Sequence, residues 1–400
     1  MQRTHFVALG ALCAAALPVA ALAQAQPGTG FNPKISLILD GKYADFSSDA
    51  EADVPGVLLG DETEFAPEGF SLGESELSLE SNIDDRFHGW FTVALEDEDG
   101  ETSVAVEEAY VDTLTLPHGL AAKFGRFFSD IGYQNRFHAH AWEFVDAPLV
   151  YRAFFARQLG DDGVQLRWLA PADLFVELGA EALRGAAFPA GGDDRSGVGA
   201  WTAFAHLGGD VGTGGSWRAG FWHYDGDADD RRSGEDVETG FTGDSAISGV
   251  DFVYKWAPDG NPAVRNFVAQ AEIMRRSEDG IVIHDPDGAA EASRYDGDQL
   301  GWYAQAVYQF VPRWRVGLRY DRLSASNDVD APLPGTSLAL LADDGSDPER
   351  WSGMIDFSNS EFSRLRLQLS RDESRPDGES DTQVFLQYIF SMGSHPAHQF

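Results

Sequence analysis

The sequence predicts an all-β protein: a transmembrane, antiparallel, up-and-down β-barrel of about 16 strands with a long third loop folded inward. Three observations predict this fold. Segments of about ten residues alternate apolar and polar side chains, which is typical of strands with one apolar and one wet face. The connections between them are alternately short and long. Beyond the N-terminal stretch, no apolar run approaches the roughly 20 residues that a membrane-spanning helix requires.

The chain begins MQRTHFVALGALCAAALPVAALAQ, a charged start followed by an Ala/Leu/Val run and an Ala-Leu-Ala before Gln24. This order predicts a secretory signal that is cleaved on export. Cys13, the sole cysteine, lies within it, so the mature chain has no disulfides or thiolate metal sites. We expect a cleaved signal peptide, an N-terminal periplasmic segment, the transmembrane barrel and a periplasmic tail that contains histidines, at 1–23, 24–33, 34–392 and 393–400.

Alternation with a period of two gives the strands in order along the chain. In WYAQAVYQF (302–310), for example, Trp, Ala, Ala, Tyr and Phe share one face, while Tyr, Gln, Val and Gln share the other. The pattern is unclear in 103–116 and 215–225. The strands are predicted at about 34–46, 69–83, 86–96, 103–116, 119–127, 163–169, 173–184, 197–207, 215–225, 246–256, 263–276, 298–311, 313–323, 350–357, 361–371 and 381–392.

The connections support the barrel more strongly than any single strand does. Turn-forming residues such as Asp84-Asp85, Pro117-His118 and Pro312 predict short turns at one end of the barrel. Acidic runs such as EDEDGE (96–101) and DGDADD (225–230) predict solvated outer loops whose carboxylates share divalent ions with lipopolysaccharide. Long connections, which we place at the opposite end, are predicted near 47–68, 128–162, 226–245, 277–297 and 324–349.

The last predicted strand carries an outward apolar row that closes in Tyr388-x-Phe390. This ending is similar to the C-terminal recognition signal of outer-membrane proteins, so we expect the barrel-assembly machinery as a partner and the Gram-negative outer membrane, with its lipid and lipopolysaccharide, as the location. A homotrimer is left open. Aromatic residues that suit the two interfacial girdles are Tyr43, Trp90, Trp168, Trp217, Trp256, Trp314 and Trp351.

Several stretches resemble known families. The segment EEAYVDTLTLPHGLAAKFGRFFSDIGY (107–133) resembles the corresponding region of the phosphate-selective porin family. The stretches SLILDGKYA, GFSLGESELSL, FHAHAWEFVDAPLVYRA and DDGVQLRWLAPADLF, with the histidine-bearing terminus, make nearly the whole mature chain similar to porin-like outer-membrane proteins described as zinc-regulated. Some members of that group are labelled TonB-dependent receptors. The resemblance implies an outer-membrane barrel and a connection with zinc.

The stretch FHAHAWEFVD (137–146) puts two imidazoles and two carboxylates inside the third long connection. When such a connection folds inward, it narrows the pore, so these side chains would face an aqueous constriction. Imidazole with carboxylate is a ligand set for zinc. We predict a metal site of His138, His140, Glu143 and Asp146. Ordinary packing and hydrogen bonding within a folded loop is the alternative.

The terminal tail offers a second pair of imidazoles, His395 and His398, in the sequence H-P-A-H. Pro396 disfavours a regular helix, so the two rings need not converge on one ion. We predict a loose metal site there, with an ordered or frayed chain end as the alternative.

Charged residues on the polar faces of the strands predict the lining of the pore. Rows of opposite sign on different strands would produce a transverse field that orients polar solutes. They would also be expected if inward charges only solvated the interior and paired with one another, and both interpretations stay open. The predicted pore-lining residues are Glu74, Glu76, Glu80, Glu177, Glu181, Arg313, Arg315, Arg319, Arg364 and Arg366.

The formal net charge of −36 makes nucleic acid a poor partner and favours cations over anions as solutes. The sequence lacks the usual hydrolase, metalloprotease and phosphate-loop motifs, and we expect no enzyme activity. We expect a porin-like channel for small polar solutes or ions, with divalent metal as a sharper hypothesis and zinc as its first candidate. No cofactor is required; zinc would be a transported or bound ion. The alternative is a non-conducting metal-binding barrel or surface receptor.

Overall fold

The chain divides into two units, Met1–Asn32 and Pro33–Phe400. The first unit lies outside the residues that the structure describes, and so do the predicted signal peptide and the tail histidines His395 and His398. The second unit is the barrel. The computed structural model describes residues 33–48, 54–60, 67–98, 101–191, 197–233, 238–258, 260–330, 341–342, 345–376 and 380–393.

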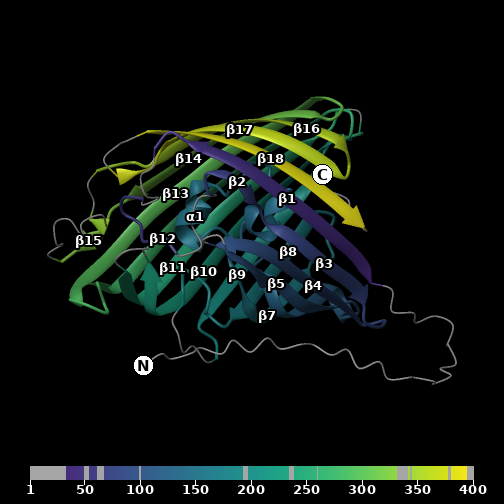
Figure 1. Ribbon diagram of the computed structural model, residues 1–400. Helices are drawn as coiled ribbons and strands as arrows, with labels where there is room; N and C mark the ends of the chain where they lie inside the picture. The colour runs from purple at the N-terminus through teal and green to yellow at the C-terminus, as the bar shows by residue number, and fades with distance from the viewer. Residues whose placement is uncertain are drawn as a thin grey trace, which may run out of the picture. The chain divides into compact units, whose positions relative to one another are not determined.

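The strands form one antiparallel sheet that closes on itself, because the first strand pairs with the last (Figure 1). β2 and β3 are two halves of one wall strand, since both pair with β1, and β15 is a two-residue addition beside β13. The wall is therefore a closed sixteen-stranded barrel, and the predicted fold is confirmed. The strands are β1 Lys34–Phe46, β2 Gly69–Leu72, β3 Ser75–Asn82, β4 Phe87–Glu98, β5 Glu101–Thr113, β6 Leu120–Phe128, β7 Gly160–Leu169, β8 Phe175–Leu183, β9 Ala200–Val211, β10 Gly215–Ser233, β11 Thr239–Trp256, β12 Asn266–His284, β13 Glu291–Val311, β14 Trp314–Ala325, β15 Asp328–Val329, β16 Glu349–Ser360, β17 Ser363–Glu373 and β18 Asp381–Gly393.

Four neighbouring strands, β10 to β13, are longer than predicted, and much of the two predicted acidic loops at 226–245 and 277–297 is strand. The inner face of these extensions carries an apolar cluster: Phe241, Val282 and Tyr295 are fully buried and pack together with Leu58 from the first loop, the connection between β1 and β2. A buried ion pair, Arg231 with Glu278, lies on the same face. Acidic residues occupy the exposed outer face. The outer face here is therefore acidic, unlike the apolar outer face of the membrane-facing part of a barrel.

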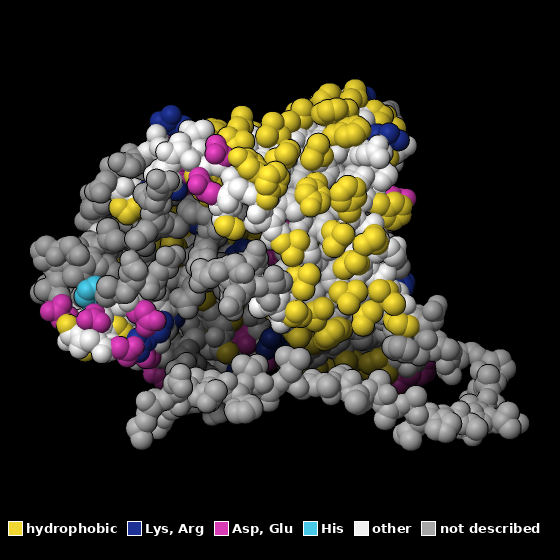
Figure 2. Space-filling view, viewed as in Figure 1, with side chains coloured by type: hydrophobic (Ala, Val, Ile, Leu, Met, Phe, Trp, Pro, Cys, Tyr) yellow, Lys and Arg dark blue, Asp and Glu magenta, His cyan; other side chains and the backbone are white. Residues whose placement is uncertain are grey.

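The outer face of the rest of the wall is apolar. Exposed Leu, Ile, Val and Phe side chains follow strand after strand, for example Phe221, Val250 and Ile273 on adjacent strands. Figure 2 shows these side chains spread over the wall and acidic side chains gathered where the extended strands end. Such a belt is expected where strands meet lipid. Among the described residues, no helix has the length and hydropathy needed to cross a bilayer.

The long connection between β6 and β7, residues 129–159, folds into the barrel, as predicted, and is called the third loop below. All seven residues of its helix are buried. Phe155 packs against Trp222 and Tyr224 of β10, and Tyr151 packs against Tyr303 of β13. The apolar cluster around this helix fills much of that side of the interior. The short helices are η2 Pro117–Gly119, η3 Gln134–Arg136, η4 Ala139–Ala141 and α1 Leu149–Phe155.

Glu272 of β12 fixes the start of the third loop to the wall. Its carboxylate accepts hydrogen bonds from the backbone N–H groups of Tyr133 and Gln134, at 3.2 and 2.9 Å, and from the hydroxyls of Tyr151 and Tyr303, at 2.8 and 2.6 Å. Four donors on one buried carboxylate satisfy its hydrogen-bonding capacity. The position of the loop is therefore set by polar contacts as well as by apolar packing.

Candidate functional site

The two imidazoles predicted as metal ligands lie together on the third loop. His138 precedes the one-turn helix η4 and His140 lies within it, and the buried Ala139 between them anchors the turn. The rings of His138 and His140 stack, with their centroids 5.8 Å apart and an interplanar angle of 23°. Both side chains approach the part of the wall formed by β2, β3 and β5.

A β-bulge in β5 brings two adjacent carboxylates to His138. Thr92 of β4 pairs with Glu108, but Val93 pairs with Val106, so Glu107 is the extra residue. A bulge re-aims side chains that regular alternation would send to opposite faces. Glu107 Oε2 lies 3.2 Å from His138 Nδ1, and Glu108 Oε2 lies 2.9 Å from its Nε2.

The break between β2 and β3 brings two further carboxylates to the same place. A side chain at Gly73 would come within 2.6 Å of Asp40 on β1, so the chain passes close to its neighbour there. Glu74 follows in the break, and its Oε2 lies 3.2 Å from Arg157 Nη1. Glu76, at the start of β3, approaches both imidazoles: its oxygens lie 3.2 Å from His138 Nδ1 and 2.6 Å from His140 Nδ1.

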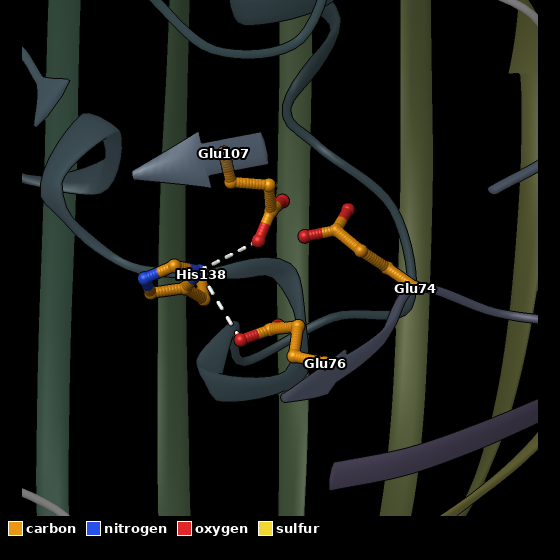
Figure 3. A group of neighbouring side chains, drawn as sticks. All are labelled: Glu74, Glu76, Glu107 and His138. Atoms are coloured by element: carbon orange, nitrogen blue, oxygen red, sulfur yellow. Dashed lines mark hydrogen bonds and ion pairs between the residues drawn. The ribbon is translucent and has the colours of Figure 1, made fainter. Parts of the chain in front are cut away.

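Glu74, Glu76, Glu107 and His138 form a compact group that we call the histidine–glutamate cluster (Figure 3). One ligand atom from each lies within 4.8 Å of all the others, and the two residues nearest the strand break are buried. Three carboxylates and one imidazole are suitable donors for a divalent cation such as zinc. The geometry can therefore hold a small cation beside the third loop.

The two imidazoles differ in charge. Burial by itself lowers the pKa of His138, but the carboxylates of Glu76, Glu107 and Glu108 outweigh it and raise that pKa well above its usual value. Burial and the charge of His138 lower the pKa of His140 to about 3. Without a cation in the cluster, a protonated His138 balances part of the negative charge around it.

The two carboxylates predicted to join the histidines lie elsewhere. Glu143 Oε2 is 2.7 Å from Arg315 Nη1, and Asp146 pairs with two arginines of the wall. The predicted set of four ligands therefore does not form one group. After η4 the loop continues toward β14, β16 and β17. A group of inward arginines on these strands, called the arginine wall below, forms ion pairs with both acids. The arginine wall consists of Arg315, Arg319, Arg350, Arg364 and Arg366.

The arginine wall meets the histidines at one point, where Arg364 donates a hydrogen bond to the backbone oxygen of His140. His140 thus lies between the histidine–glutamate cluster and the arginine wall. Of the other residues predicted to line the pore, Glu80 pairs with Lys34, 2.5 Å away, and Arg366 lies 3.4 Å from Asp356.

Two further predicted acids lie inside the wall at β8. Glu177 lies 3.0 Å from His206 Nδ1, and Glu181 accepts hydrogen bonds from the hydroxyl of Thr202 and the backbone N–H of Asp130. Arg313 departs from the prediction. It is exposed in the turn between β13 and β14 with a φ of 74°, because β13 ends at Val311, two residues before it, and the alternation stops there.

Sequence reasoning missed Glu107, Glu108 and Arg350. The signal for the first two was present: adjacent acids interrupted the alternation of 103–116, and the bulge is the reason. Arg350 is the second residue of β16 and lies on its buried face, with no exposed side-chain surface. Because Arg350 directly follows a long predicted loop, the alternation did not extend far enough to predict that its side chain points inward.

Comparison with known proteins gives one relative by sequence and several by structure. No family model matches the chain. An uncharacterized protein of Aquifex aeolicus is 30% identical over 398 residues, covering 92% of this chain and 80% of its own length. The outer membrane channel DcaP of Acinetobacter baumannii has a TM-score of 0.53 at 16% identity, covering 90% of this chain and 96% of its own.

Two other solved structures share the fold. The anion-selective porin of Comamonas acidovorans has a TM-score of 0.53 at 11% identity, with 90% of this chain and 99% of the porin covered. Vibrio cholerae OmpT, described as a trimer form, has a TM-score of 0.51 at 11% identity, with the same two shares covered. At these identities the likeness concerns the barrel architecture.

Proposed function

We propose that this chain, which belongs to the same family as the Aquifex aeolicus protein, is a porin-like channel of the Gram-negative outer membrane for small polar solutes or ions. The apolar outer belt suits insertion into lipid, and the structurally similar proteins include an outer membrane channel and a porin. A C-terminal strand with an outward apolar row suits delivery by the barrel-assembly machinery. A homotrimer is part of the proposal, and native mass measurement in detergent tests it.

The observation that carries the proposal is the lining of inward side chains of both charges along an inward-folded loop. Acids gather in the break between β2 and β3 and on β3 and β5. Arginines gather on β14, β16 and β17, where they pair with Asp321, Asp356 and Asp372 of the same strands, and the third loop contacts both groups. Such an arrangement orients polar solutes as they pass, because dipoles and ions respond to the field across the constriction.

We further propose that a divalent cation, zinc first among the candidates, binds transiently at the histidine–glutamate cluster on its way through. Glu74, Glu76, Glu107 and His138 supply oxygen and nitrogen donors within 4.8 Å. A site on a conduction path must release its ion, so the affinity has to be modest. The protonated His138 helps here, since a cation must displace that proton to use the imidazole.

A non-conducting metal-binding barrel or surface receptor is the second candidate. It is favoured by the apolar packing of α1, which buries Phe154 and Phe155 against the wall and leaves less of the interior to water. The first loop adds Val54 and Val57 to the same cluster. In this alternative the histidine–glutamate cluster would retain its metal rather than pass it on.

Planar-bilayer conductance of the refolded mature protein separates the two. A channel gives a steady ohmic current that falls as zinc is added, and the double variant His138→Ala, His140→Ala keeps the current but loses its zinc sensitivity. His223→Ala is the matched control, because His223 lies on β10, where its ring hydrogen-bonds the hydroxyl of Ser248 and packs against Trp201, away from the histidine–glutamate cluster. Absence of current, together with bound zinc in the purified protein, supports the metal-binding barrel instead.

A further inference from the structure

A pocket of about 200 Å³ lies on a different part of the inner wall, between the third loop and strands β10 and β11. The loop contributes residues on either side of η3, and the wall contributes the first residues of β10 and the last of β11. These strand ends adjoin short turns, so the pocket lies toward the short-turn end of the barrel. It is lined by Tyr133, Arg136, Phe137, Ser216, Trp217, Arg218, Val253 and Lys255.

The charge of this pocket has one sign. Arg136, Arg218 and Lys255 line it, and none of its lining residues is acidic. Arg218 has two buried N–H groups, on Nε and Nη1, without a hydrogen-bond acceptor among the described atoms. Asp251 Oδ1 is 3.7 Å from Nη1, which is an ion-pair distance but too long for a hydrogen bond, and the third nitrogen, Nη2, donates to the backbone oxygen of Gly132 at 3.5 Å. Buried donors of this kind normally have a partner.

All three cations of the pocket contact one aromatic ring, that of Tyr133. The guanidinium groups of Arg136 and Arg218 lie 5.9 and 5.4 Å from the centre of the Tyr133 ring, and the ammonium of Lys255 lies 5.8 Å from it. Arg136 also lies 5.3 Å from the ring of Phe137. Cation–π contacts offset part of the repulsion between like charges. The remaining repulsion would be relieved by an anion bound among the three groups.

We propose that this pocket binds a small organic carboxylate, with its charged group between Arg218, Arg136 and Lys255 and its apolar part against Tyr133 and Phe137. Arginine is well suited to carboxylates because its planar group can donate two parallel hydrogen bonds. The volume is below the roughly 300–1,000 Å³ of sites for drug-sized ligands, which favours a compact molecule. Binding requires only the folded barrel, whereas a role as a binding site on the path of a transported solute rests on the proposed channel function.

Calorimetric titration of the refolded mature protein in detergent tests the proposal, with benzoate, acetate and inorganic phosphate as probes. We expect benzoate to bind more tightly than acetate or phosphate. Arg218→Gln and, separately, Lys255→Gln should weaken benzoate binding by about tenfold or more, because each removes a charged donor. Arg275→Gln is the matched control, since Arg275 lies on the outer face and pairs with Asp298.

Three results would overturn the proposal: no benzoate binding at millimolar concentration, equal binding of all three probes, or an equal loss in the Arg275→Gln control. If Arg218→Gln does not fold, the more exposed position Arg136 offers Arg136→Gln as the second variant. Conductance is measured on the same preparation. If the wild-type protein conducts but does not bind benzoate, the carboxylate site alone is refuted, whereas wild-type benzoate binding without conductance refutes the channel alone.

Discussion

Asp146 ties the third loop to the arginine wall, and Asp146→Asn measures how firmly the loop is held. One carboxylate oxygen accepts hydrogen bonds from Arg319 Nη2 at 2.8 Å and Gln368 Nε2 at 2.9 Å. The other lies 2.7 Å from Arg350 Nη1. Asparagine retains the shape of the side chain but removes its charge, so the two arginines lose their shared counter-ion.

The expected cost follows from burial. The side chains of Arg319 and Arg350 are 1% and 0% exposed, and that of Asp146 is 18% exposed. Removing one partner of a buried ion pair typically costs about 3–5 kcal/mol. Asp321 remains 2.9 Å from Arg319 Nε and partly compensates. We therefore expect a loss of about 3 kcal/mol, the lower end of that range.

Urea unfolding of the barrel in lipid bilayers, followed by tryptophan fluorescence, provides the free energy of unfolding. Asp287→Asn is the control, because Asp287 is 87% exposed and its replacement should leave that free energy within about 0.5 kcal/mol of the wild type. If Asp146→Asn behaves like this control, the third loop is not held by its ion pairs and the reasoning is refuted.

The same variant has a defined pH dependence. Burial by itself raises the pKa of Asp146, but Arg350 and Arg319 lower it below its usual value, so the folded state favours the ionised form. The contribution to stability is present above the unfolded pKa of about 3.9 and is lost as pH falls through the lower folded value. The stability difference between wild type and Asp146→Asn should be constant from about pH 8 to 5 and narrow only below about pH 4. A difference that narrows near neutral pH would contradict this assignment.

Three further predictions concern the packing of the loop and wall. Phe155→Ala removes a buried ring 5.9 Å from Trp222 and should cost about 3–5 kcal/mol in urea unfolding while increasing single-channel conductance; unchanged conductance would show that α1 does not obstruct the path. Glu272→Gln replaces one accepting oxygen with an amide NH2 group, which cannot accept the hydrogen bonds that the loop donates to Glu272. The rate of amide hydrogen exchange at Gln134 should therefore rise, and an unaltered rate would refute the anchoring role. Gly125→Ala should destabilise the barrel by at least about 1–3 kcal/mol, because φ is +126° there and a side chain would lie 2.1 Å from a backbone oxygen of β5; a neutral effect in urea unfolding would contradict the strain.

Sequence was sufficient for the wall because lipid on one side and water on the other impose a period of two. β1 occupies the predicted residues 34–46, and all sixteen wall strands overlap the predicted ranges. The lengths of β10 to β13 were underestimated because acidic composition indicates loops, whereas alternation with buried residues such as Tyr295 indicates strand. Where acids alternate with buried apolar residues, the alternation is the better guide.

The site was less predictable, because no local pattern determines which part of the wall a loop reaches. His138 and Glu143 are five residues apart, yet one meets β5 and the other meets Arg315, 172 residues further along the chain. The inward direction of Glu107 depends on a bulge whose register is set by pairing with β4. Both the path of the loop and the register of the bulge depend on contacts between distant parts of the closed barrel, which no segment of ten residues contains.

The unequal strand lengths give the barrel a slanted rim. β13 has 21 residues and β6 has 9, which at about 3.3 Å per residue correspond to strands of about 70 and 30 Å. The tall side carries a line of exposed aspartates on neighbouring strands, Asp227, Asp244, Asp279 and Asp296, each directly opposite the next. In the proposed channel, this row of aspartates would raise the local concentration of cations along one side of the entrance, before a solute reaches any residue of the interior.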